Sequence, residues 1–451
     1  MALPFGSELA GPFGLIWALP FLGMLLTIAL APLVAPRLWH RHYGKAAAFW
    51  AAAFLVPDGM RTGGRATLAS FLDMALHQYL PFMLLLGALF VIAGGLRLTG
   101  TPRATPAVNT ALLAGGVVLA SVIGTIGAAM LLLRPLLRAN RHRAQPTHVF
   151  VFFIFLVANV GGALTPLGNA PLLLGYLKGV PFFWPAIHLA LPTLVLTAGL
   201  LGTFYALDRM TQRRAREDGQ RVMAEIEKLG IEGAVNLALL PVAILALMVK
   251  SLLPPSDGVE ILGVPWSMAD IAADALLVMA AGLSLALTRP ATRQANAFAW
   301  EPLVEVAILF AVIFVTLIPV TEMMAAGLSG PAAPLFAQIY AGGTANNALY
   351  YRMTGLLSAL LDNAPTYLMF FGLAGNDAAK LAGPFAGTLA AVSAGAAYFG
   401  GLTYIGNAPN LMVKAIVESQ GLRMPSFFGY VGYAAVCLLP WLLVVEALFF
   451  H

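Results

Sequence analysis

A short cluster of glycine, asparagine, alanine and proline occurs twice in the chain, each time just after a threonine. Residues 164–174 read LTPLGNAPLLL and residues 402–412 read LTYIGNAPNLM, an offset of 238 residues (402 minus 164). Glycine and proline interrupt an apolar helix, because glycine is conformationally loose and proline lacks an N–H donor. The freed carbonyls, a hydroxyl and an amide oxygen suit a dehydrated cation, whereas the half-helix N-terminus beyond the break favours an anion.

Two other segments are related by the same offset, and one of them holds a carboxylate. IGTIGAA at 123–129 and LDNAPTY at 361–367 each interrupt an apolar stretch, so that Gly124 corresponds to Asp362. A carboxylate at the bilayer centre costs roughly 2.5–3.5 kcal/mol on insertion scales, so we expect Asp362 to bind a cation, a proton, or each in turn. The plainer alternatives are that Asp362 caps the helix after it and that the GNAP clusters are proline kinks that pack small residues. A carboxylate has two oxygens, so a cap can also be a ligand.

The composition sets the class of protein that must position these motifs. The 451 residues are 60% hydrophobic and 10% charged, against roughly 25% charged in a soluble protein. Apolar runs of about 20 residues recur along the chain, as expected of membrane-spanning helices. We therefore predict an all-α polytopic membrane protein, without a cleavable signal peptide. The single cysteine, Cys437, excludes an internal disulfide, and no motif predicts an enzyme or binding to nucleic acid.

The apolar runs predict about ten transmembrane spans and two re-entrant helical hairpins. The hairpins are 107–137 and 346–375, because each is apolar throughout but broken halfway. Irregular backbone at such a break is tolerated in a membrane only where protein or water covers it. The predicted spans are 14–36, 46–58, 71–96, 148–178, 183–207, 234–252, 268–288, 303–325, 386–415 and 426–449.

The basic residues are distributed unevenly over the connecting loops, and this predicts the orientation. Six loops hold 19 of the 25 lysines and arginines: 37–45, 97–103, 134–143, 209–228, 289–293 and 414–423. Because cytoplasmic loops are rich in these residues, the loops are expected on the cytoplasmic side of a bacterial-type inner membrane. Both termini are then periplasmic, and both ends of segment 107–137 lie on the same side, as a hairpin requires.

The two hairpins enter from opposite sides in this topology, so the halves form an inverted repeat. The first repeat is 1–207, with hairpin 107–137 and broken helix 148–178. The second repeat is 234–451, with hairpin 346–375 and broken helix 386–415. Residues 208–233 form a cytoplasmic connector, in which 212–231 is expected to be a short amphipathic surface helix. Paired interruptions in inverted halves indicate a binding site near the middle of the membrane.

Four motifs of the chain resemble the ion transporter superfamily. They are IGTIGAAMLLLRPLLRANR, NVGGALTPLGNAPLLLGYLKGVPFFW, LLDNAPTYLMFFGLAG and LTYIGNAPNLMVKAI. The most similar branch contains NhaD-type sodium/proton antiporters and CitMHS-like citrate transporters, and it is related to arsenite exporters. The resemblance implies a homodimer held by a scaffold part, with a transport part that moves as an elevator.

The resemblance also implies the binding residues and one departure from the family pattern. A first cation-type site and a second are implied at Gly124, Thr125, Thr165 and Asn169, and at Asp362, Asn363, Thr403 and Asn407. The Na⁺ ligands among them are Thr125, Asn169, Asp362, Asn363 and Asn407. Many relatives have GDPP where residues 168–171 read GNAP. The departure leaves Asp362 as the only acid in the four motifs, which questions a two-cation or strongly electrogenic stoichiometry.

The function expected from these residues is secondary active transport. The leading hypothesis is sodium/proton antiport, in which Asp362 exchanges Na⁺ and H⁺. The alternative is transport of citrate or a dicarboxylate coupled to Na⁺, H⁺ or a divalent metal, and a third is export of arsenite or another oxyanion. The expected partners are therefore the lipid bilayer and either a small inorganic cation or a small carboxylate. No cofactor is expected besides the coupling ions.

Overall fold

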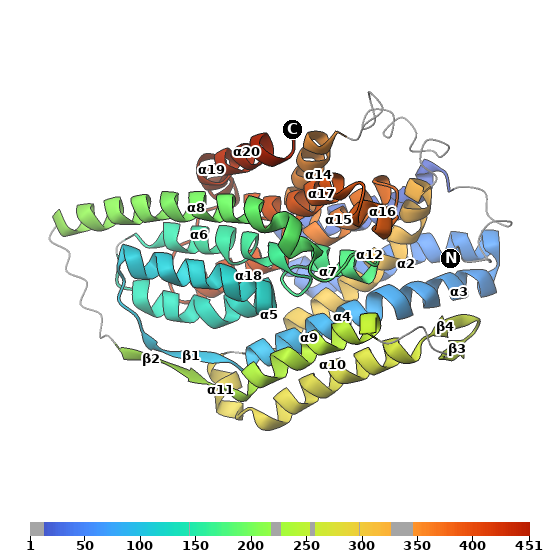
Figure 1. Cartoon of the computed structure of the whole chain (residues 1–451), viewed down its shortest axis with the longest axis horizontal. Helices are drawn as coiled ribbons and strands as arrows, with labels where there is room; N and C mark the ends of the chain where they lie inside the picture. The colour runs from blue at the N-terminus through green and yellow to red at the C-terminus, as the bar shows by residue number, and fades with distance from the viewer. Residues whose placement is uncertain (1–12, 144, 218–226, 253–257, 297, 326–345) are drawn as a thin grey trace.

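The computed structural model describes residues 13–143, 145–217, 227–252, 258–296, 298–325 and 346–451 of the chain (Figure 1). This part of the chain is mostly helical, and its two sheets have two strands each. It contains seven helices that are long and apolar enough to cross a membrane, or eight if the bent C-terminal pair forms one span. The chain is thus an integral membrane protein of the predicted all-α class.

The elements follow one another along the chain, and Figure 1 labels most of them. The first part comprises η1 (Leu15–Ala18), α1 (Leu19–Val34), α2 (Pro36–Thr62), α3 (Gly64–Met74), η2 (Ala75–Tyr79), α4 (Leu80–Gly94), β1 (Arg97–Thr101), α5 (Pro106–Asn140), α6 (Thr147–Leu156), η3 (Val160–Leu164), α7 (Ala170–Leu177) and α8 (Trp184–Glu217). The second comprises β2 (Glu227–Glu232), α9 (Val235–Leu252), β3 (Val259–Ile261), β4 (Val264–Trp266), α10 (Met268–Leu287), α11 (Pro290–Ala295), α12 (Glu301–Ala325), α14 (Asn347–Leu361), α15 (Asn363–Leu373), α16 (Ala378–Ala382), α17 (Ala386–Phe399), η5 (Gly400–Leu402), α18 (Ala408–Ser419), α19 (Phe427–Cys437) and α20 (Leu439–Phe449).

The helices occur where the apolar runs predict spans, but several differ in length. The span predicted at 71–96 begins earlier, because α3 continues through the π-helical turn η2 into α4. The span predicted at 46–58 lies within α2, which carries basic residues at both ends and is not among the seven. The apolar part of α9 is shorter than a full span. The total of ten spans therefore stays a prediction.

Segment 107–137 folds back on itself at Gly124, within α5. Gly124 has φ 79° and ψ 156°, a conformation that interrupts the helix. The side-chain amide of Asn109, near the start of α5, donates a hydrogen bond of 3.0 Å to Oδ1 of Asn140 at its end. A straight helix would separate two residues 31 positions apart by roughly 46 Å. The two arms of the hairpin therefore lie side by side.

Segment 346–375 has the same construction. Its arms are α14 and α15, and Asp362 joins them with φ 75° and ψ 148°. The Tyr350 hydroxyl, in the first arm, donates to the carbonyl of Leu373 at the end of the second arm, at 3.2 Å. The two tips thus share one backbone conformation. That the tips reach the middle of a bilayer stays a prediction.

Both GNAP motifs coincide with interruptions of helices. In the first, α6 ends, the short η3 follows, and α7 starts after an extended stretch; in the second, α17, η5 and α18 repeat the arrangement. Thr165 and Thr403 are both extended, as are Asn169 and Asn407 directly before α7 and α18. The half-helix α6 is buried on all sides, as expected of a helix that is apolar all round.

A two-stranded ribbon occupies a part of the connector that was expected to be helical. The prediction of an amphipathic helix over 212–231 is wrong for its last residues, because 227–232 form strand β2, which pairs with β1, whereas 212–217 belong to α8. Residues 218–226 lie outside the described residues. Strand β1 supplies the backbone hydrogen-bond partners of β2, and no pattern in the sequence predicts this pairing. Gly100 permits the close pairing: it has φ 84°, and a Cβ there would lie 2.2 Å from the carbonyl oxygen of Lys228.

Several of the basic loops meet at one end of the molecule, around this ribbon (Figure 1). Arg138, in the second arm of α5, donates to the carbonyls of Gly100 and Leu98 in β1. Arg134 donates to a carbonyl at the end of α11, and the Thr147 hydroxyl donates to the carbonyl of Arg423, beyond α18. This end carries much of the positive charge, but its cytoplasmic orientation stays a prediction.

Candidate functional site

The two hairpin tips and the two helix breaks meet around one cavity. Its volume is about 70 Å³, room for several waters where one needs roughly 10–15 Å³ by the same measure. Apolar side chains of α4 and α12, including Phe82 and Phe310, close the remaining wall. Six of the eight predicted binding residues line the cavity: Gly124, Thr125, Asn169, Asp362, Asn363 and Asn407.

Four helices begin at this cavity. The second arm of α5 follows Gly124, α15 follows Asp362, α7 follows Asn169, and α18 follows Asn407. Neither α7 nor α18 has a side-chain cap, and both have proline in the first turn. A helix N-terminus carries a partial positive charge of roughly half an elementary charge and presents unpaired N–H groups. The cavity therefore attracts negative charge without a basic side chain.

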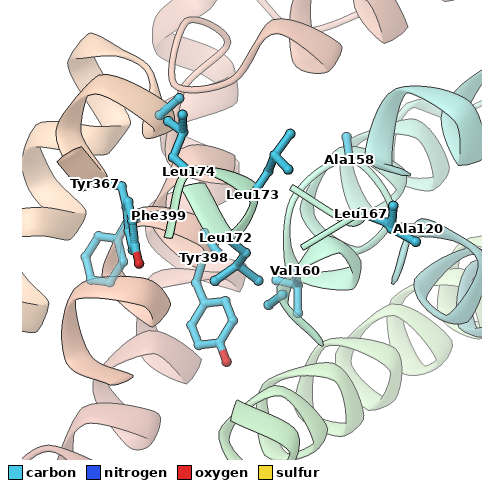
Figure 2. Close-up of a cluster of buried hydrophobic side chains, with 14 of the residues drawn as sticks. Ala120, Ala158, Val160, Leu167, Leu172, Leu173, Leu174, Tyr367, Tyr398 and Phe399 are labelled. Atoms are coloured by element: carbon cyan, nitrogen blue, oxygen red, sulfur yellow. The ribbon is translucent and has the colours of Figure 1, made fainter. Parts of the chain in front are cut away.

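Apolar packing holds the half-helix α7 in place. Figure 2 shows Leu172, Leu173 and Leu174 of α7 in a cluster with Tyr367 of α15 and with residues of α17, η3 and α5. All the labelled residues are buried: Ala120, Ala158, Val160, Leu167, Leu172, Leu173, Leu174, Tyr367, Tyr398 and Phe399. This cluster combines side chains from both halves of the chain, so apolar packing connects α7 to α15 and α17.

A direct hydrogen bond joins the first helix break to the second hairpin tip. Nδ2 of Asn363 donates to Oδ1 of Asn169 at 2.9 Å. The other polar atoms of these two amides, Oδ1 of Asn363 and Nδ2 of Asn169, are buried and have no hydrogen-bond partner among the described residues. A buried polar atom without a partner costs roughly 1–3 kcal/mol. The pair thus presents one acceptor and one donor that a ligand can satisfy.

Asp362 is partly exposed at the cavity and is the only carboxylate that lines it. Its Oδ1 accepts a bond of 3.3 Å from the amide of Ala364, so it also caps α15, and the Thr366 hydroxyl donates to its carbonyl at 2.8 Å. No ion pair of the described residues involves it. In the same residues, no group of three or more histidine, cysteine, aspartate or glutamate side chains is placed to hold a metal ion. The site thus offers one carboxylate to a monovalent cation or a proton.

Two of the three predicted threonines, Thr165 and Thr403, do not line the cavity. The Thr165 hydroxyl donates to the carbonyl of Ser121, and the Thr403 hydroxyl donates to the carbonyl of Ala359. Both bonds join a helix break to the first arm of the hairpin of the same half, and the offset of 238 residues relates the two bonds (403 minus 165). Both hydroxyls donate to carbonyls of the hairpins, so these threonines hold the hairpin tips in position and do not face a ligand. We call these two hydrogen bonds braces.

The two braces are expected to differ in strength. The Thr403 hydroxyl also accepts from the amides of Ile405 and Gly406, at 3.2 and 3.1 Å, whereas no amide of the described residues donates to the Thr165 hydroxyl. A hydrogen bond contributes roughly 1 kcal/mol. Thr403→Val should therefore lower the melting temperature in detergent more than Thr165→Val. Equal losses in the two variants would contradict the extra bonds at Thr403.

Two buried asparagines next to the site were not predicted. Asn159 and Asn410 are fully buried and hydrogen-bonded to each other and around the second break. The offset relates them to Ala397 and Leu172, so a comparison of the two halves does not reveal them. The one available signal was an asparagine inside an apolar run.

A largely apolar helical protein whose broken helices meet at a cavity has the architecture of a secondary transporter. A family model matches residues 11–450, and its description reads "Putative citrate transport". The chain therefore belongs to this family of membrane transport proteins, and the match favours the citrate branch of the predicted superfamily. A search of curated proteins finds no match. Family membership indicates a transporter and not an enzyme.

Proposed function

We propose that the protein transports citrate or a similar di- or tricarboxylate across the membrane, coupled to the binding of Na⁺ or H⁺ at Asp362. The observation that carries the proposal is the convergence of four helix N-termini on one cavity that contains a single acid. A site for a cation alone needs oxygens, and amide N–H groups would repel the ion. The described lining instead combines both kinds of group, as a site for a carboxylate and its coupling ion requires.

The carboxylate groups of the substrate would bind at the starts of α7 and α18. Ala170 and Ala408, the first residues of these helices, line the cavity, and neither is buried. Each N-terminus contributes typically 0.3–1 kcal/mol, and up to about 2 kcal/mol in a partly buried geometry. Two such contacts favour a substrate with at least two carboxylates over a monocarboxylate.

The coupling ion would bind at Asp362, with the free amide oxygens of Asn363 and Asn407 as further ligands. Two like charges about 6 Å apart repel by roughly 3 kcal/mol at an effective dielectric constant of 20, a factor of about 100 in affinity. An ionised Asp362 without its cation would therefore weaken carboxylate binding. The cation or a proton removes this penalty, so substrate and ion bind together.

The transport step is proposed to follow the inverted-repeat scheme with about ten spans. In this scheme a part that contains both hairpins and both broken helices moves as an elevator against a scaffold, in a homodimer in a bacterial-type inner membrane. The bond between Asn169 and Asn363 supports movement of both half-sites as one body. Both termini are placed on the periplasmic side.

The second candidate function is sodium/proton antiport. The observation that favours it is the Asp362 carboxylate, which forms no ion pair in the described part of the chain. Such a group can bind Na⁺ and H⁺ in alternation. Under this alternative, a Na⁺ gradient drives proton transport in the absence of any carboxylate substrate.

One flux experiment separates the two functions. The full chain is reconstituted in liposomes, and uptake of labelled citrate is measured under gradients of Na⁺, Li⁺, K⁺ or pH, beside a dye for internal pH. We expect a Na⁺ or H⁺ gradient to drive uptake of citrate and unlabelled di- and tricarboxylates to compete with it. A response of the pH dye to Na⁺ without movement of citrate would establish antiport instead.

A further inference from the structure

Asn159 lies between α6 and η3 and is fully buried. Its Nδ2 donates two bonds of 2.8 Å, one to the carbonyl of Ile154 and one to Oδ1 of Asn410. Its Oδ1 accepts a bond of 3.2 Å from Nδ2 of Asn407, which lines the cavity. Both polar atoms of the Asn159 side chain are therefore used, and Asn407 links it to the binding site.

Asn159 and Asn410 satisfy backbone carbonyls that the two helix breaks leave without helical partners. The amide of Ala158 donates to the carbonyl of Phe153, so the carbonyl of Ile154 lacks the partner that a regular helix provides, and Asn159 supplies it. In the second half, Asn410 donates to the carbonyls of Gly400 and Thr403, at 2.7 and 2.9 Å. The bond between Asn159 and Asn410 joins the two side chains that satisfy these carbonyls. It therefore fixes the position of one helix break relative to the other.

The same network sets the orientation of the Asn407 amide. Nδ2 of Asn407 donates to two acceptors, the carbonyl of Ala158 at 2.9 Å and Oδ1 of Asn159 at 3.2 Å. A flipped amide would place its oxygen against two acceptors, so this orientation is strongly preferred. The oxygen of Asn407 makes no hydrogen bond to the described residues and is left to the cavity. Asn159 and the carbonyl of Ala158 together therefore favour the orientation in which Asn407 presents an acceptor to a ligand.

We propose that Asn159 is a positioning residue for coupling: it fixes the Asn407 oxygen toward the cation and ties the two half-sites together. This inference rests on the proposed function, because it assumes that a cation binds at Asp362. Asn159 touches neither ion nor substrate and acts through Asn407. The role is asymmetric, since Ala397 occupies the corresponding position of the second half and forms no such bond.

The test compares Asn159→Ala and Asn159→Asp with a matched control. Aspartate keeps an acceptor for Nδ2 of Asn407 but loses both donated bonds, whereas alanine loses all three. The control is Asn236→Ala, because Asn236 is also fully buried and bonds to Gly233 and Thr288 away from the cavity. Melting temperature in detergent, citrate uptake, and the Na⁺ concentration for half-maximal uptake are measured for each protein.

The expected result is a rise in the half-maximal Na⁺ concentration of about tenfold for Asn159→Ala, equal to one lost interaction of about 1.4 kcal/mol. Asn159→Asp should show a smaller rise than Asn159→Ala. Asn236→Ala should lower the melting temperature without changing the Na⁺ dependence. This difference between the Asn159 variants and Asn236→Ala would separate a role in positioning the cation ligand from a general loss of stability.

Two other outcomes are distinguishable. If wild-type protein responds to Na⁺ and citrate but Asn159→Ala has an unchanged Na⁺ dependence, or one shared with Asn236→Ala, the inference is overturned and the proposed function stands. If wild-type protein moves no citrate and melts at the same temperature with and without Na⁺ and citrate, the proposed function is overturned and the inference with it. Should Asn159→Ala fail to fold, Asn159→Leu decides the question, because leucine preserves the volume of the side chain and adds no buried charge.

Discussion

Asp362→Asn and Asp362→Gly are expected to abolish ion-coupled uptake and leave the protein folded. Asparagine keeps the size of the side chain but removes the only carboxylate that lines the cavity. Without that negative charge, the cation loses roughly 3 kcal/mol of attraction at an effective dielectric constant of 20, about 100-fold in affinity. Labelled citrate uptake into liposomes under a Na⁺ gradient measures the loss.

The control for this prediction is an acid elsewhere in the membrane part. Glu322 lies near the end of α12 and is exposed, so Glu322→Gln should keep gradient-driven uptake. Undiminished uptake in Asp362→Asn would remove the coupling role assigned to Asp362. A uniform loss in both variants would instead indicate that any missing acid impairs the protein.

The glycine variant carries a second expectation, about stability. Asp362 has φ 75° and ψ 148°, a region that glycine enters freely and that costs other residues of the order of 1–3 kcal/mol. Glycine relieves this strain and loses the cap that the carboxylate provides at the start of α15, including the bond to the amide of Ala364. Asp362→Gly should therefore melt at the same temperature as wild type or higher, although it transports nothing. A melting temperature below that of Asp362→Asn would argue against backbone strain at the tip.

Gly124→Ala is the second substitution with a large expected effect. Gly124 has φ 79°, and a Cβ there would lie 3.2 Å from the carbonyl oxygen of Leu167, which lines the cavity. Alanine at this φ costs of the order of 1–3 kcal/mol, and the contact pushes the tip away from the first break. We expect a lower melting temperature and a loss of citrate uptake.

The control for Gly124→Ala lies in the same hairpin. Gly115 has helical φ, and a Cβ there would meet no atom within 4 Å. Gly115→Ala should be neutral or stabilise the first arm by roughly 0.5–1 kcal/mol, with unchanged uptake. If the two alanine variants behaved alike, the tip conformation would have no special role.

The two hairpin tips have the same backbone conformation, but one tip residue is a glycine and the other is an aspartate. Gly124 adopts it without strain, whereas Asp362 is one of three non-glycine residues of positive φ in the described part of the chain. A strained residue persists only where the surroundings over-determine it, and such residues cluster at functional sites. The carboxylate at this position is therefore maintained against a backbone preference.

The chain's own patterns were sufficient to predict the elements that build the site. Apolar runs locate most helices, because the bilayer demands that backbone groups be paired within each helix. The offset between the GNAP motifs, and between the tips, locates the four breaks, since glycine and proline act on their own segment of chain. Six of the eight residues chosen on this basis line the cavity.

The features that the sequence did not predict depend on contacts between distant segments of the chain. Such contacts leave no local pattern in the sequence. Strand β2 forms because β1 lies beside it, so the segment 227–232 could not be assigned from its own sequence. The hydroxyls of Thr165 and Thr403 turned to carbonyls of the hairpins instead of the cavity. Asn159 meets Asn407 and Asn410 across about half the chain, 248 and 251 residues away.

The sequence alone determined that this is a helical membrane protein, where its helices break, and which single acid its motifs contain. These properties follow from hydrophobicity and backbone chemistry, which act within a few residues. Only the tertiary structure decided which groups face the cavity: four helix N-termini, one carboxylate, and amides turned by their neighbours. The physical reason is that hydrogen-bond direction depends on partners supplied by the other half of the chain.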